Sequence, residues 1–106
     1  MQVIRWQEKT LPTERELREL MQCEGFSPYT WSNGPSYTYA AHTHTYEKVL
    51  YCVRGSIRFV LPEQVNAEGN ADFVDLNPGD CMILPPHTMH SAIVGPHGVT
   101  CLEASR

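Results

Sequence analysis

The sequence predicts an all-β fold, a jelly-roll barrel with one short α-helix near the N-terminus. Two observations favour it. A helical pattern is confined to residues 13–24, and from residue 29 onward short β-branched and aromatic runs alternate with turn residues. A chain of 106 residues has room for one domain and one core. We therefore expect residues 1–106 to form a single domain, with the barrel at 29–103.

A helix over residues 13–24 is indicated by its start and stop signals. Thr13 and Glu16 have the spacing of a capping box, in which each side chain bonds the backbone N–H of the other residue. Gly25 ends the pattern. We expect the charged residues of this helix to face solvent and its apolar residues to pack against the barrel or a partner subunit. These apolar residues are Leu17, Leu20 and Met21.

Eight short strands are expected between the turns. Asn33-Gly34, Arg54-Gly55, Pro78-Gly79 and the segment 95–98 have turn chemistry. The polar stretch 62–71 has no periodicity and is predicted to be a hairpin loop. The strands are expected at residues 29–31, 37–41, 46–53, 56–61, 72–76, 81–84, 90–94 and 99–103.

Composition and charge exclude several classes of function. The net charge is −4 and the eight Lys and Arg are scattered, so no basic surface for nucleic acid is expected. No apolar run reaches the roughly 20 residues that span a bilayer, and the first residues lack the apolar stretch of a secretory signal. We therefore expect no membrane partner and a cytoplasmic location. The four cysteines form no Cys-x-x-Cys, and three of them lie in apolar runs typical of buried, reduced thiols.

His42 and His44 are candidate metal ligands. Residues two apart on a strand point to the same face, so both imidazoles can reach one ion. Neutral imidazole is a good ligand for transition metals. Two histidines at a strand end are also common as plain surface residues, and the pair by itself leaves both interpretations open.

A second segment adds to this pattern. Gly79 lies six positions before Pro85, and His90 lies five after it. Together with His42-Thr43-His44 and the apolar run that ends at Gly55, this resembles the two sequence motifs of the cupin superfamily. The first family motif is His-x-His, three or four residues, Glu, six residues and Gly; the second is Gly, five residues, Pro-x-Gly, two residues and His. The resemblance covers roughly residues 37–103.

The resemblance implies a small single-domain cupin that binds one divalent metal ion. His42, His44 and His90 take the positions of three family metal ligands, and the ion would be iron, zinc, nickel or manganese. Small cupins tend to dimerise, and a barrel with exposed sheet edges can hide them by pairing with a copy of itself, so a homodimer is expected.

Two residues depart from the family pattern. Lys48 stands at the glutamate position, and the nearby acid, Glu47, would point to the opposite face of a regular strand unless a bulge re-aims it. His87 stands at a family glycine, where a turn role or ligation is open. Three outcomes compete for Lys48: it contacts a bound anion beside the metal, the site has lost its metal, or the side chain turns away into an ion pair.

The apolar residues around the site suggest a cavity for a small molecule. Leu50 and Cys52 share the face of the histidines. Four further residues are candidates to line the cavity, although aromatic residues in strands are as well explained by core packing. These are Trp31, Tyr37, Tyr39 and Met82.

Three functions are compatible with these features. The first is a metal-dependent enzyme acting on a small organic molecule, of the dioxygenase, isomerase or lyase class, because three histidines leave coordination positions open. The second is a non-catalytic module that binds or senses a small-molecule ligand, with Lys48 as a substrate-binding residue for an anion. The third keeps the barrel and treats the histidines as vestigial. The sequence places the enzyme narrowly first.

Overall fold

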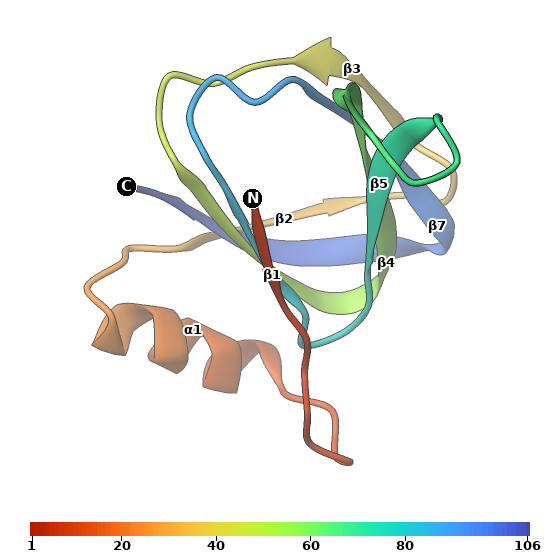
Figure 1. Cartoon of the computed structure of the whole chain (residues 1–106). Coiled ribbons are helices and arrows are strands. Elements are labelled where there is room, and N and C mark those ends of the chain that lie inside the picture. The colour runs from red at the N-terminus through yellow and green to blue at the C-terminus, as the bar shows by residue number, and fades with distance from the viewer.

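A computed structural model describes residues 1–106 and contains seven strands and one helix (Figure 1). The strands wind into a barrel and the helix lies outside it, which confirms the predicted all-β jelly roll with one short helix. In chain order the elements are β1 (Gln2–Ile4), α1 (Glu14–Cys23), β2 (Tyr29–Asn33), β3 (Thr38–His42), β4 (Lys48–Val65), β5 (Ala71–Leu76), β6 (Cys81–Leu84) and β7 (His90–Ser105).

The long strands β4 and β7 form the spine of the barrel. They pair antiparallel along most of their lengths. The prediction that turns at Gly55 and at residues 95–98 divide each of them into two strands was wrong, because both run on through these segments. The register shifts on either side of Gly55 explain the difference: bulges let the strand pair bend while its hydrogen bonds continue.

This bend divides the barrel into two arms that face each other. In one arm the first half of β4 and the second half of β7 lie between β6 and β2, with β1 at the edge beside β6. In the other arm the remaining halves of β4 and β7 pair with β5 and β3. Inward-pointing side chains from both arms form one buried core.

Side chains along the first half of β4 alternate between two cores. Leu50 and Cys52 point into the barrel, as expected, and belong to its interior core. Val49 and Val53 point outward and belong to a second core that the helix covers. The alternation makes β4 buried on both faces, and this places the next inward position, Lys48, inside the barrel.

Helix α1 closes the outer core. The Thr13 hydroxyl accepts the backbone N–H of Glu16 at 3.1 Å, as in the expected capping box. Leu17 and Met21 are fully buried against the sheet, whereas Leu20 is 43% exposed. No helix is long and apolar enough to cross a membrane.

The N-terminal strand β1 was not predicted. It pairs with β6 and is fixed by a buried carboxylate: Asp80 accepts the backbone N–H of Trp6 at 3.0 Å and a guanidinium N–H of Arg5 at 2.9 Å. The Trp6 ring packs on Gly79 so closely that a Cβ there would lie 2.5 Å from it. The first residues are therefore part of the barrel wall.

The hairpin between β4 and β5 is shorter than predicted. β4 extends to Val65 and β5 begins at Ala71, so residues 66–70 alone form the connection. The Asn66 carboxamide oxygen accepts two backbone N–H groups of this turn, at 3.0 and 3.1 Å. Such local side-chain bonds specify a tight turn.

We predict that Gly55→Ala lowers the free energy of unfolding by about 2–4 kcal/mol in urea denaturation. Gly55 has φ of 78°, and a Cβ there would lie 2.0 Å from the Gly98 carbonyl oxygen, where the two long strands bend together. Gly34→Ala is the matched control, because nothing lies within 4 Å of its added Cβ. Equal stability of the two variants would contradict the role given to the bend.

Candidate metal centre

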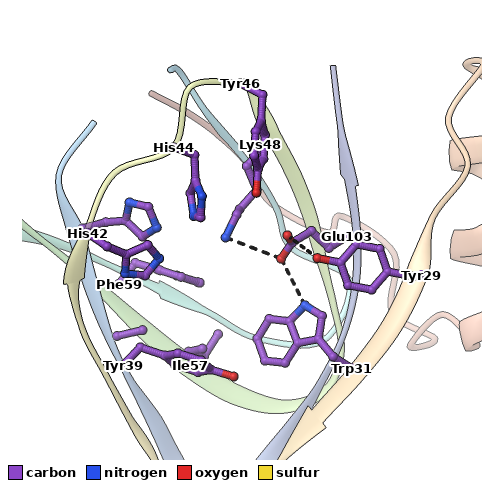
Figure 2. A pocket seen from close by; sticks show the side chains of 12 residues that line it. Tyr29, Trp31, Tyr39, His42, His44, Tyr46, Lys48, Ile57, Phe59 and Glu103 are labelled. Atoms are coloured by element: carbon purple, nitrogen blue, oxygen red, sulfur yellow. Dashed lines mark hydrogen bonds and ion pairs between the residues drawn. The ribbon is translucent and has the colours of Figure 1, made fainter. Parts of the chain in front are cut away.

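A cavity of about 310 Å³ opens between the two arms of the barrel. One side carries three histidines, and the other carries a cluster of charged and aromatic residues (Figure 2). The wall between them is apolar. It is formed by Trp31, Tyr39, Ile57, Phe59 and Ala92.

The three histidines come from two strand ends and the connection beside them. His42 ends β3 and lies opposite His90, the first residue of β7, in the antiparallel ladder. His44 follows in the connection to β4, where its carbonyl accepts the backbone N–H of His87 at 2.7 Å. The structure brings one nitrogen from each of the three imidazoles within 4.8 Å of the others.

Hydrogen bonds set the orientation of two of these rings. The Nδ1 of His42 lies 2.7 Å from the Ala40 carbonyl, and the Nδ1 of His90 lies 2.9 Å from the Thr88 carbonyl. A carbonyl only accepts, so Nδ1 carries the proton in each ring and Nε2 keeps its lone pair. This tautomer leaves Nε2 of His42 and of His90 free to bind a metal.

The free nitrogens of the site lack partners within the protein. The Nε2 atoms of His44 and His90 are buried and have no hydrogen-bond partner. Buried polar atoms are rarely left unsatisfied, and each such atom requires a physical explanation. Two unpartnered ring nitrogens that converge with a third imidazole fit the donor set of a divalent transition metal.

Burial also keeps these rings neutral. Desolvation lowers the pKa of His44 and of His90 from the ordinary value, and the nearby Lys48 ammonium lowers both further. Only the neutral imidazole binds a metal, so the lowered pKa favours the ligating form.

Lys48 lies inside the cavity and forms a buried ion pair. Its Nζ is 3.5 Å from Glu103 Oε1, and the two residues are 8% and 6% exposed. Glu103 of β7 lies opposite the inward-pointing Leu50 of β4 in the ladder. Its side chain therefore points into the barrel, as that of Lys48 does. Figure 2 shows the ammonium between the histidines and the carboxylate.

Glu103 is held by two further donors. The Tyr29 hydroxyl donates to Oε2 at 2.6 Å, and the Trp31 indole N–H donates to Oε1 at 3.1 Å. Burial, followed by the bond to Glu103, raises the pKa of Tyr29 well above its usual range, so Tyr29 remains a donor. The carboxylate is therefore fixed opposite the histidines.

The other sequence candidates lie outside the cavity. Glu47 points away and accepts a bond from Arg106 Nε at 2.7 Å. His87 is exposed with φ of 64°, which is a turn conformation. Tyr37 is 50% exposed and Met82 belongs to the barrel core, so neither lines the cavity.

Sequence reasoning missed Glu103 and Tyr29. A signal for Glu103 was present: it continues the inward alternation of Val99 and Cys101 in an otherwise apolar strand. An acid at such a position needs a buried partner, and Lys48 needed an acid. Tyr29 carried no comparable signal, because aromatic residues at the start of a strand are common.

A jelly-roll barrel of this kind, with three histidines at one side of its cavity, has the cupin fold. Within this fold class, residues 28–101 match the AraC-like ligand binding domain, and the chain belongs to that family. No curated protein sequence matches it.

Solved structures show the same fold at low sequence identity. The Bacillus subtilis oxalate decarboxylase studied for its Mn(II) centres is 21% identical with a TM-score of 0.62, over 76% of this chain and 20% of that one. A cupin-2 domain protein of Shewanella frigidimarina is 12% identical, with a TM-score of 0.59 over 76% and 71% of the two chains. KdgF from Halomonas sp. is 21% identical, with a TM-score of 0.56 over 76% and 68%. This chain thus spans about a fifth of the decarboxylase.

We predict that Glu103→Gln lowers the free energy of unfolding by about 3 kcal/mol in buffer containing EDTA, because it leaves the Lys48 ammonium buried without a counter-charge. The double variant Lys48→Met/Glu103→Gln should recover most of this loss. Asp75→Asn is the control, since its pair with Arg58 is exposed on both sides and should matter little. Additive losses in the double variant would contradict a buried pair.

Proposed function

We propose that this chain is a metal-dependent ligand-binding module in which His42, His44 and His90 hold one divalent ion. The observation that carries the proposal is the pair of buried, unpartnered Nε2 atoms that converge with the third imidazole. A bound ion would supply Lewis acidity and open coordination positions. Iron, zinc, nickel and manganese all suit such a site.

The protein's own groups give the cavity its binding character. Lys48 presents an ammonium to the same space as the imidazoles and is the proposed ligand-binding residue for an anionic group. The aromatic wall would contact an apolar part of the ligand, and the volume lies at the small end of the roughly 300–1,000 Å³ usual for ligand pockets. A small organic molecule is the expected occupant.

A binding or sensing role is placed ahead of catalysis for two reasons. The family is that of a ligand-binding domain. Glu103 is also held by Tyr29, Trp31 and Lys48, and these contacts occupy the carboxylate oxygens that a general base would use.

A metal-dependent enzyme of the dioxygenase, isomerase or lyase class is the second candidate. It is favoured by the position of Lys48, which can donate a proton into the space beside three histidines. The two functions differ in what happens to the bound molecule: a sensing module releases its ligand unchanged, whereas an enzyme converts it into a product.

We predict that the purified protein binds about one equivalent of Zn²⁺. His42→Gln or His44→Gln should weaken this binding by more than roughly 10–100-fold, which is the usual cost of losing a residue that only hydrogen-bonds to a metal ligand. Competition with a fluorescent chelator measures the affinity. His97→Gln is the matched control, because His97 is exposed and away from the cavity. Unchanged metal content in the His42→Gln/His44→Gln variant would mean that the histidines are vestigial.

We also propose that the chain forms a homodimer, as small cupins do. The barrel leaves β1 and β2 as sheet edges, and Ile4, Leu11 and Leu20 of the N-terminal third are exposed. Light scattering coupled to size exclusion should give twice the 12.0 kDa of one chain. A mass near 12.0 kDa would rule the dimer out.

A further inference from the structure

The Lys48 ammonium has more hydrogen-bond donors than it has partners within the protein. Its one ion-pair partner is Glu103, at the long distance of 3.5 Å, and Glu103 already accepts two shorter bonds. An ammonium has three donors. At 8% exposure little solvent reaches the ammonium, whose nitrogen lies within the cavity, so an acceptor that enters the cavity would meet a donor that no protein group uses (Figure 2).

The charge balance of the cavity favours an anion. The charges of Lys48 and Glu103 cancel, and imidazole binds a metal in its neutral form, so a divalent ion would leave two uncompensated positive charges. Buried charge without compensation is costly, and water can compensate only in part inside a partly enclosed cavity. A ligand that carries a carboxylate would bring negative charge to both the ion and the ammonium.

Lys48 acts on the metal position as well as on the ligand. Its ammonium lines the same cavity as the three imidazoles and lies between them and Glu103, so its positive charge repels any other cation held there (Figure 2). A metal ion bound by these rings would meet the same repulsion. Glu103 exerts the opposite influence, because its negative charge favours a cation and disfavours an anion.

We propose that Lys48 makes this pocket selective for small carboxylic acids at the expense of metal affinity, and that Glu103 is the positioning residue that holds the ammonium and offsets its charge. The inference rests on the proposed metal site. Because the carboxylate and the ion attract each other, each binds more tightly in the presence of the other, as linkage requires.

The proposal requires opposite changes in two affinities from one substitution. Lys48→Met keeps the length of the side chain and removes its charge, so it should weaken carboxylate binding about tenfold and strengthen Zn²⁺ binding about fivefold. Glu103→Gln should shift both affinities in the other direction. A structural defect in the pocket would weaken both ligands together.

The probes are Zn²⁺, benzoate and its neutral isostere benzamide, each titrated by calorimetry into wild type and variants. Benzoate suits the aromatic wall of Trp31, Tyr39 and Phe59, and benzamide reports any binding that does not need the negative charge. Lys9→Met is the matched control, since Lys9 is the one other lysine and is exposed outside the cavity. Thermal unfolding in EDTA establishes that each variant is folded.

The proposal is supported if benzoate binds more tightly than benzamide, and if Lys48→Met, but not Lys9→Met, weakens benzoate binding about tenfold and strengthens Zn²⁺ binding. The proposal is overturned if wild type and Lys48→Met bind benzoate with equal affinity, or if Lys48→Met loses both benzoate and Zn²⁺ binding. If Lys48→Met does not fold, two other variants provide the same test. Glu103→Gln should bind benzoate more tightly and Zn²⁺ more weakly than wild type, and Lys48→Arg should keep the affinity for benzoate. Absence of Zn²⁺ binding in every protein would overturn the proposed function, while Lys48-dependent benzoate binding in EDTA would still support the carboxylate subsite.

Discussion

The antiparallel pairing of β4 with β7 is the constraint on which the rest of this structure depends. The two strands pair along most of their lengths and bend together where Gly55 meets Gly98. The bend turns one long ribbon into two facing arms. Residues at opposite ends of the ribbon, Glu103 in one arm and His90 in the other, therefore line the same cavity. A close backbone approach that only glycine permits thus positions the site.

The cavity that results contains two kinds of buried polar group, which differ in whether they have a partner within the protein. The imidazole nitrogens of His44 and His90 are buried without partners, which is tolerable only if a bound group satisfies them. The Lys48–Glu103 pair is satisfied within the protein and is surrounded by aromatic donors. A buried ion pair of this kind contributes little net stability but places charge with precision. The proposed metal ion would satisfy the histidine side, while the charges on the opposite side already balance each other within the protein.

Lys48 stands at the family's glutamate position, but the site still contains a carboxylate, that of Glu103. An acid at residue 48 would add a fourth, anionic ligand beside the three histidines. Here the negative charge comes from β7, across the ladder, and the ammonium lies between it and the imidazoles. The chain belongs to a family of ligand-binding domains, and under the proposed function this exchange of charges would favour an anionic ligand over a neutral one.

The sequence by itself determined the elements whose signals are local. The capping box of α1, the alternation along β4 and the His42-Thr43-His44 pair all depend on neighbours a few residues apart. Only the resemblance to the cupin motifs added His90 to this pair, and the structure brings the three rings together. The tertiary structure alone decided where Lys48 points and which acid meets it. Lys48 and Glu103 are far apart in the chain, and their contact depends on the register of β4 against β7 and on bulges that shift it. Such register is set by packing and bending of the whole barrel, which no local pattern encodes.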